Sequence, residues 1–305
     1  MKKVILTAAI TGGLHTPGMS PYLPYKPEDI IEEAVKAYQA GASVVHIHAR
    51  DPETGKPKSD LNLMKKIVKG IKERSDVVIC ITTGGAPGMS LEERVKAIPK
   101  LKPELASCNA GSINFVLSPI ANKFESRFEW ENKFLESTED FIFSNSYKSL
   151  KYYIETMNKN GTRPEFEVYD VGMINTIAYF INKGIIKKPV YIQFVMGILG
   201  GIPANVKNLV HLVSTAEDLI EDFKWSTCAA GRRQFPMTAT SLAMGGFARV
   251  GLEDNLYLRP KQLAKSNAEH ITQIREIAER FGLSPATPDE AREILSLKGL
   301  ENVNY

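Results

Sequence analysis

Short runs of β-branched and other apolar residues alternate along the chain with longer stretches in which apolar residues recur every three to four positions. The first pattern is typical of strands and the second of amphipathic helices. The strand pattern occurs eight times, in residues 4–10, 43–48, 77–82, 104–109, 165–170, 190–195, 223–228 and 248–253. The helical pattern covers residues 26–40, 60–73, 91–98, 147–159, 174–183, 206–214, 235–244 and 261–281. The alternation predicts parallel strands joined by crossover helices.

Eight consecutive strand-helix units predict an α/β fold, a single (β/α)8 TIM barrel spanning residues 1–305. A doubly wound sheet is the alternative. The barrel is favoured because no G-x-G-x-x-G pattern follows the first strand, and because the first and last strands end in polar, glycine-flanked turns. Residues 112–145 exceed a simple crossover and are predicted to form an insertion. Residues 289–297 are predicted to form a short C-terminal tail helix.

The composition limits the classes of function. The 305 residues are 43% hydrophobic and 24% charged, as in folded globular proteins. The net charge of +3 is too small and too evenly spread to indicate nucleic-acid binding. Every apolar run is shorter than the roughly eighteen residues of a membrane span. Cys80, Cys108 and Cys228 form no C-x-x-C pair, which favours a reducing, cytoplasmic compartment.

Two histidines lie near the carboxyl end of the second predicted strand, where TIM barrels carry their functional residues. His46 and His48 are two positions apart, so a strand directs both to the same face. Two imidazoles in that arrangement can converge on one metal ion. The alternative is a pair of hydrogen-bonded core histidines.

Two adjacent acids, Glu253 and Asp254, end the last predicted strand, which also contains Arg249. Neighbouring carboxylates there need a cation or an arginine to offset their desolvation. A helix-initiating turn capped by Asp254 is the alternative. Two histidines and one carboxylate leave one position open, which is the pattern of a catalytic zinc site, because structural sites normally close with four protein ligands.

Small polar residues end the third and fourth predicted strands. Thr82, Thr83 and Gly85, and then Ser107 and Asn109, offer hydroxyl, amide and backbone N–H groups that can hold a carboxylate. Ordinary turns are the alternative.

Glu167 is a charged residue within an apolar strand and needs a partner, which a place beside the metal ligands would supply. Schiff-base chemistry is disfavoured, because Lys224, the lysine within the predicted strands, lies near the start of its strand and so at the wrong end of the barrel.

Taken together, these segments resemble the β-keto acid cleavage enzyme family, whose best-known type is the 3-keto-5-aminohexanoate cleavage enzyme. The resemblance covers nearly the whole chain. It rests on seven blocks in one order: ILTAAITG (5–12), VHIH (45–48), TGG (83–85), NAG (109–111), EVY (167–169), QFV (193–195) and GLEDN (251–255). It implies a zinc-dependent, homotetrameric barrel enzyme that converts a β-keto acid and acetyl-CoA into acetoacetate and a new acyl-CoA.

The resemblance also implies roles for individual residues. His46, His48 and Glu253 match the zinc ligands of the family. Asp254 matches the general base, and Arg249 matches the residue that orients it. The chemistry agrees, since zinc on the ketone oxygen acidifies the neighbouring CH2 group and a nearby carboxylate can remove its proton.

At the substrate end, Thr82, Gly85 and Ser107 match positions that hold the carboxylate, although the type enzyme has serine in place of Thr82 and threonine in place of Ser107. One position departs further. Leu14 stands where the type enzyme has an acid for the substrate's amino group, and a leucine cannot pair with an ammonium. We therefore expect an uncharged or apolar acyl tail, with the next residue, His15, either lining the pocket or exposed to solvent.

Two other functions remain open from the sequence. The first is a metal-dependent aldolase or hydrolase on a similar barrel that uses no CoA thioester. The second is a barrel that binds zinc without catalysis. Dependence of product formation on acetyl-CoA distinguishes the cleavage enzyme from the first alternative. An effect of Asp254→Asn on turnover distinguishes it from the second.

Overall fold

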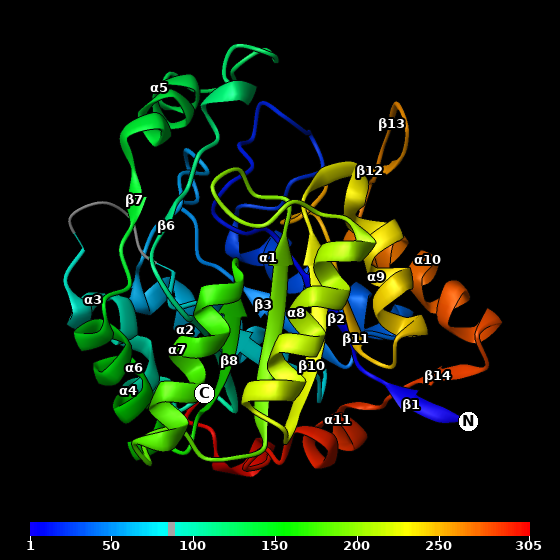
Figure 1. The fold of residues 1–305 in the computed structure, drawn as a ribbon. Coiled ribbons are helices and arrows are strands. Elements are labelled where there is room, and N and C mark those ends of the chain that lie inside the picture. The colour runs from blue at the N-terminus through cyan, green and yellow to red at the C-terminus, as the bar shows by residue number, and fades with distance from the viewer. Residues whose placement is uncertain (85–88) are drawn as a thin grey trace.

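The computed structural model describes residues 1–84 and 89–305 and contains a closed barrel of eight parallel strands surrounded by helices (Figure 1). The strands follow one another around the barrel in chain order, and β11 pairs with β2 to close it. This confirms the predicted TIM barrel. The strands are β2 (Leu6–Ala9), β3 (Val44–Ile47), β4 (Val78–Ile81), β5 (Leu105–Asn109), β8 (Arg163–Val168), β9 (Val190–Met196), β10 (Phe223–Ala229) and β11 (Phe247–Val250).

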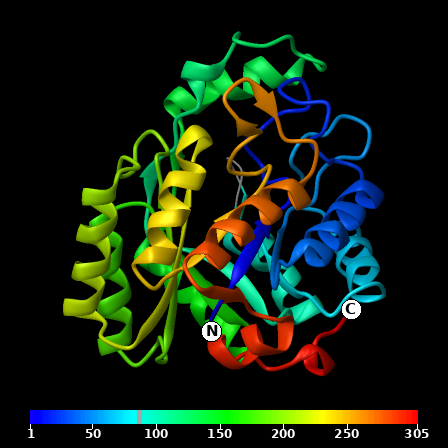
Figure 2. The ribbon, with the colours of Figure 1, turned by 90° about the vertical axis from the view of Figure 1, so that its right-hand side faces the viewer.

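The helices of the crossovers pack around the outside of the barrel (Figures 1 and 2). Their starts follow local sequence signals: at α2, for example, the Asp60 side chain accepts the backbone N–H groups of Asn62 and Leu63. The helices are α1 (Pro27–Ala40), α2 (Leu61–Lys72), α3 (Leu91–Val95), α4 (Ala97–Leu101), α6 (Tyr147–Lys159), α7 (Val171–Asn182), α8 (Val206–Leu219), α9 (Gln234–Ala243) and α10 (Asn267–Arg280).

Proline explains where the predicted helix 91–98 differs from the structure. The helix stops at Val95 and resumes as α4, which ends three residues beyond the prediction. Pro99 has no backbone N–H, and its ring would clash with the carbonyl of Val95 in a continuous helix. Within the first turn of α4 the same proline is tolerated, because N–H groups there have no helical partner.

The last strand and the last crossover helix are both shorter than predicted. Strand β11 ends at Val250, not at Glu253, because the chain turns at Gly251. Helix α10 starts at Asn267, not near residue 261, because β12 (Tyr257–Arg259) and β13 (Gln262–Leu263) form a hairpin that precedes it. Both differences concern segments in which the apolar pattern runs through a turn.

The hydrophobic core lies between the strands and the helices in two halves. One half joins β5, β8, β9 and β10 to α6, α7 and α8, and contains Phe166, Phe194 and Ile174. The other joins β2, β3, β4 and β11 to α1, α2 and α10, and contains Ile30, Ile67 and Ile271 in addition to strand residues. Burial of these apolar side chains is the main favourable term in the folding of the barrel.

The predicted insertion at residues 112–145 is confirmed and covers the carboxyl end of the barrel. It consists of β6 (Ile113–Asn114), a short 3-10 helix, α5 (Trp130–Ser137), a second 3-10 turn and β7 (Ile142–Phe143). Glu131 attaches it to the loop after β2, because its carboxylate accepts the Gly18 N–H at 2.8 Å and the Thr16 hydroxyl. Trp130 donates to the Thr54 carbonyl in the loop after β3. The insertion is thereby held above the strand ends.

The opposite end of the barrel carries both termini (Figures 1 and 2). There β1 (Lys2–Val4) pairs with β14 (Leu283–Pro285), and the predicted tail helix is present as α11 (Pro288–Leu295). Among the helices of residues 1–84 and 89–305, none combines the length and the hydropathy needed to cross a bilayer.

Candidate active site

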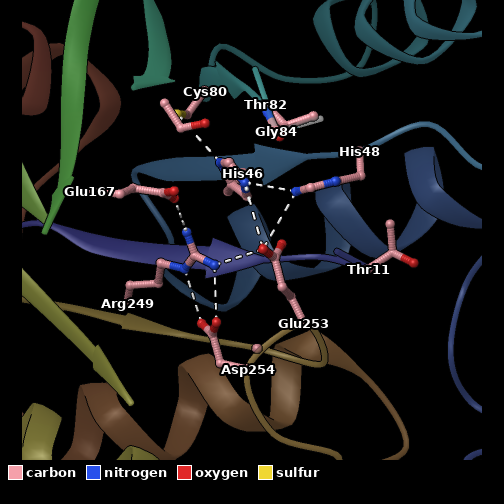
Figure 3. A network of polar contacts seen from close by, with 12 residues as sticks. Thr11, His46, His48, Cys80, Thr82, Gly84, Glu167, Arg249, Glu253 and Asp254 are labelled. Atoms are coloured by element: carbon pink, nitrogen blue, oxygen red, sulfur yellow. Dashed lines mark hydrogen bonds and ion pairs between the residues drawn. The ribbon is translucent and has the colours of Figure 1, made fainter. Parts of the chain in front are cut away.

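Three side chains predicted to bind metal meet at the carboxyl end of the barrel. The Nε2 atoms of His46 and His48 are 3.1 Å apart. Glu253 Oε1 lies 3.7 Å from His46 Nε2 and 3.4 Å from His48 Nε2. Figure 3 shows the two rings and the carboxylate directed toward one another. The structure therefore brings together residues that are about 200 positions apart in the chain.

Backbone geometry explains how these side chains converge. His46 lies in β3 and His48 follows directly after its last residue, Ile47, and their spacing of two positions is the one that directs both side chains to the same side. Glu253 is reached through Gly251, whose φ is 148° and where a Cβ atom would lie 2.2 Å from the carbonyl oxygen of Ala9. A side chain at Gly12 would likewise lie 2.3 Å from Glu253 Cγ. Glycine at both positions lets the turn after β11 approach the ends of β2 and β3.

The three side chains fit a divalent cation such as zinc. Ligand atoms at about 2.05 Å from a tetrahedral zinc lie about 3.3 Å from one another. The observed separations of 3.1, 3.4 and 3.7 Å bracket that value. Glu253 Oε2 is buried without a hydrogen-bond partner in residues 1–84 and 89–305, which is costly unless a cation satisfies it. All three residues also line a cavity, so a further ligand has access.

Arg249 connects the predicted ligand Glu253 to two other carboxylates (Figure 3). It is 3% exposed, and its guanidinium donates to both oxygens of Asp254 at 2.9 and 3.0 Å. It also donates to Glu253 Oε1 at 2.8 Å and to Glu167 Oε1 at 3.4 Å. Glu167 thus has the partner that its position in an apolar strand required. The buried guanidinium of Arg249 thus holds three acids in a fixed arrangement.

The ionisation of the two adjacent acids differs. Burial opposes the charge on Glu253, but Arg249 and the two histidines outweigh burial and lower the pKa of Glu253 well below its usual value. Burial raises the pKa of Asp254 to about 6, even though Arg249 opposes the shift. Glu253 is therefore a carboxylate suited to bind a cation, and Asp254 titrates close to neutrality, as a general base should.

Two further polar residues lie behind His46, deeper in the barrel. His46 Nδ1 is 3.5 Å from Cys80 Sγ, and the Cys80 thiol donates to Glu165 Oε1 at 3.6 Å. Burial raises the pKa of Cys80 well above its usual range and that of Glu165 to about 7. Burial also lowers the pKa of His46 well below its usual value, so this ring is neutral. Sequence reasoning assigned no contact to Cys80 and overlooked Glu165, although Glu165 and Glu167 share one face of the same strand.

A cavity of about 250 Å³ extends from the three-ligand cluster. We call the part of its lining formed by the three predicted ligands, Arg249 and Asp254 the charged end. Other charged residues also line the cavity: Lys58, Asp60, Glu93, Arg94 and Lys96. A second part of the lining is apolar, and we call it the apolar wall: Leu14, Phe115, Leu117, Phe134, Phe141, Phe143, Val195 and Ile198. The Phe115 ring centroid is 6.1 Å from those of Phe143 and Tyr169, which joins the wall to the residues near the ligands. The sequence did not reveal this wall, although several of the phenylalanines scattered through the insertion form it.

The residues predicted to hold the substrate's carboxylate divide into two groups. Thr82 and Asn109 line the cavity, and Asn109 Nδ2 donates to Glu167 Oε2 at 2.6 Å. Thr83 and Ser107 are buried and bonded to each other: the Thr83 hydroxyl donates to the Ser107 carbonyl at 2.7 Å, and the Ser107 hydroxyl accepts the Thr83 N–H. This pair ties the carboxyl ends of β4 and β5 together. Gly85 lies outside the described residues.

Leu14 and His15, which distinguish this chain at the substrate end, point to different places. Leu14 lines the cavity and packs against the core cluster that contains Phe115 and Phe143. The ring of His15 is half-buried, and its Nδ1 lies 2.8 Å from the Leu252 carbonyl oxygen. His15 therefore takes neither predicted position, because a carbonyl on the neighbouring turn engages its ring.

Comparison with known proteins gives consistent results over the whole chain. A sequence model described as beta-keto acid cleavage enzyme matches residues 3–297. A 3,5-dioxohexanoate:acetyl-CoA acetone transferase of Paraburkholderia graminis is 44% identical over 306 residues, which is 100% of this chain and 99% of the relative. A 3-keto-5-aminohexanoate cleavage enzyme of Acetoanaerobium sticklandii is 39% identical, covering 97% of this chain and 99% of the relative.

Solved structures support the fold alone. The apo structure of ObcA superimposes with a TM-score of 0.72 at 20% identity, over 91% of this chain and 66% of that chain. The HMG-CoA lyase from Brucella melitensis superimposes with a TM-score of 0.55 at 10% identity, over 97% of this chain and 98% of that one.

Proposed function

The chain belongs to the β-keto acid cleavage enzyme family, whose members are acetyl-CoA-dependent transferases, and from this premise we propose its substrate class and its catalytic residues. The proposed reaction takes a 3-oxo acid with a neutral acyl tail and acetyl-CoA. The acyl group passes to the CoA sulfur, and the acetyl group passes to the CH2–carboxylate unit, which yields acyl-CoA and acetoacetate. The catalytic domain spans residues 1–305 and acts as a homotetramer that depends on zinc.

The arrangement of His46, His48 and Glu253 carries this proposal. The three residues offer ligand atoms at suitable separations, and all of them line the same cavity. Three protein ligands beside a cavity favour a catalytic cation over a structural one, because a structural site normally has four protein ligands. Bound there, a zinc ion supplies Lewis-acid polarisation of the substrate's keto oxygen, which acidifies the adjacent CH2 group.

The neighbouring side chains position and move the proton. Asp254 accepts a proton from the CH2 group between the ketone and the carboxylate. Arg249 donates to both oxygens of Asp254 and so holds this base against the cavity. Thr82 and Asn109 bind the substrate's carboxylate by hydrogen bonds. The Thr83–Ser107 pair keeps the two strand ends at the spacing which that binding needs.

The apolar wall supports the choice of a neutral tail. Leu14 and the phenylalanines of the insertion offer no counter-charge to an ammonium, whose desolvation would cost several kcal/mol. An uncharged tail gains free energy from the same surface, at about 25 cal/mol for each Å² buried. The relative from Paraburkholderia graminis, named for a dioxo acid without an amino group, is consistent with this choice.

A product screen tests the function. Purified protein is offered acetyl-CoA with a panel of 3-oxo acids, and the products are identified by mass spectrometry before and after chelation and zinc return. We expect acetoacetate and a matching acyl-CoA only when both acetyl-CoA and metal are present. Product without acetyl-CoA would indicate an aldolase or hydrolase, and bound zinc without any product would indicate a non-catalytic barrel. A preference for 5-amino-3-oxohexanoate over every neutral acid would refute the neutral tail.

A further inference from the structure

The two contacts behind His46 have no place in the reaction proposed above. Cys80 Sγ lies 3.5 Å from His46 Nδ1, and its S–H donates to Glu165 on the far side. In Figure 3, Cys80 lies across the His46 ring from Glu253. His46, Cys80 and Glu165 are each 0–1% exposed. Polar groups this deeply buried are expected to have a specific task, because their desolvation is unfavourable.

The contact at Nδ1 determines which nitrogen of His46 can bind a cation. A neutral imidazole carries one N–H group and one lone pair. Since Nε2 faces His48 and Glu253, cation binding needs the lone pair on Nε2 and the proton on Nδ1. A buried N–H needs an acceptor. Within residues 1–84 and 89–305, the atom that pairs with His46 Nδ1 is Cys80 Sγ.

Glu165 determines how the thiol is oriented. Sulfur accepts hydrogen bonds weakly, and it can do so toward His46 only when its own hydrogen points elsewhere. Glu165 Oε1 receives that hydrogen. The other carboxyl oxygen of Glu165 is buried without a hydrogen-bond partner in the described part of the chain, so the bond from Cys80 is the hydrogen bond that this carboxyl group makes.

His48 has no such support from residues 1–84 and 89–305. Its side chain is 18% exposed, and no hydrogen bond to its Nδ1 is present within residues 1–84 and 89–305. Within the described residues the two histidines are therefore unequal, because only His46 is oriented by a side chain behind its ring.

We propose that Cys80 and Glu165 are positioning residues for His46, which act through its Nδ1 and keep its Nε2 directed at the cation. The role rests on the metal site of the proposed function. Partners of this kind commonly change metal affinity about 10- to 100-fold when they are removed, because they set the orientation and basicity of the ligand.

Zinc affinity of the full-length protein, measured by competition with a chromophoric chelator, tests the role. Cys80→Ala should weaken zinc binding about 10- to 100-fold. Cys80→Ser should recover most of that loss, because a hydroxyl both accepts and donates. Glu165→Gln keeps an acceptor for the S–H and should bind zinc nearly as the wild type does. Glu165→Met, of similar length without a strong acceptor, should resemble Cys80→Ala.

Cys108→Ala is the matched control. Cys108 is also a fully buried thiol on a barrel strand, but it belongs to the hydrophobic core cluster that contains Ile98 and Phe166. We expect its removal to lower thermal stability without changing zinc affinity. The cobalt(II)-loaded protein gives a second measurement: its d–d absorption should change in Cys80→Ala, and the wild type should show no sulfur-to-cobalt charge-transfer band.

Three results would overturn the positioning role. Equal zinc affinity in wild type and Cys80→Ala would do so, as would equal losses in Cys80→Ser and Cys80→Ala. A charge-transfer band, or a second zinc lost with Cys80, would make His46, Cys80 and Glu165 ligands themselves. If the wild type binds no divalent cation, the proposed function fails and this role with it. An intact zinc site that is insensitive to Cys80 and Glu165 refutes the positioning role alone.

Discussion

Two parts of the cavity lining, the charged end and the apolar wall, are built on different physical principles. At the charged end, Arg249 bonds three buried acids, and one of them, Glu253, also faces the two histidines, so each side chain depends on specific partners. At the apolar wall, Leu14 and the phenylalanines of the insertion contribute area without directed bonds. Losing one member of the first set leaves a buried charge unpaired, whereas losing one member of the second removes only a share of the contact area. Chemistry is therefore expected to be intolerant of change and substrate choice to be adjustable.

The largest effect should come from the charged end. Asp254→Asn removes the proposed base but leaves an amide oxygen for Arg249 to bind. We expect kcat to fall about 10²- to 10⁴-fold, while zinc content stays at the wild-type level, because Asp254 is not among the three ligands. Steady-state kinetics and metal analysis measure the two quantities. Asp218→Asn, on the exposed surface of α8, is the control for the same chemical change. Unchanged turnover in Asp254→Asn would remove the base from the mechanism.

A charge placed in the apolar wall should change the substrate preference. Leu14→Glu supplies a counter-charge for an ammonium, and we expect the ratio of kcat/KM for the 5-amino acid to that for a neutral acid to rise about 100-fold. Leu14→Gln has the same length without the charge and should shift the ratio little. If the two variants behave alike, the wall does not select by charge.

The pH dependence of stability tests a histidine outside both parts of the cavity lining. His270 is fully buried, accepts a hydrogen bond from Gln234 at 2.7 Å, and has its pKa lowered by burial to about 4. The unfolded chain takes up a proton near pH 6.5 that the folded chain refuses until about pH 4. The contribution of His270 to the free energy of unfolding is therefore complete above pH 6.5 and is lost as the pH falls from 6.5 to about 4.

For His270 the loss between pH 7 and pH 5 should be about 2 kcal/mol, measured by denaturant unfolding at both values. In His270→Gln this part of the pH dependence should vanish. His211→Gln, which changes an exposed histidine on α8, should keep it. Equal slopes in all three proteins would contradict the burial argument.

The smallest effect should come from trimming the apolar wall. Phe141→Ala removes one half-buried ring that packs on Phe143, with centroids 6.4 Å apart. We expect kcat/KM to fall about 10-fold for the longest neutral tail and to stay nearly constant for the shortest, since only the long tail loses apolar contact. Phe281→Ala at an exposed site is the control. A uniform loss for all tails would place Phe141 in structural support instead of substrate contact.

Much of the barrel could be predicted from the spacing of apolar residues, because the buried face of each strand and each helix leaves its own period in the sequence. The three predicted metal ligands could also be picked out, since His46 and His48 are two positions apart in a predicted strand and Glu253 closely follows the last strand. The break at Pro99 was available from the sequence in principle, because proline prevents a continuous helix there. The hairpin at 257–263 was harder to predict from the sequence. Its residues Leu258 and Leu263 pack against a small hydrophobic cluster that contains Leu256, and this contact is not visible in the local sequence.

What the sequence alone determined is the class of fold and the chemical type of the charged end, because strand alternation and residue type are local properties. The tertiary structure alone decided that Arg249 pairs with three acids, that Cys80 and Glu165 lie behind His46, and that the insertion supplies most of the apolar wall. These contacts join segments far apart in the chain, and their distances follow from closure of the barrel and from the space that Gly12 and Gly251 leave for the turn after β11. No local pattern contains that information.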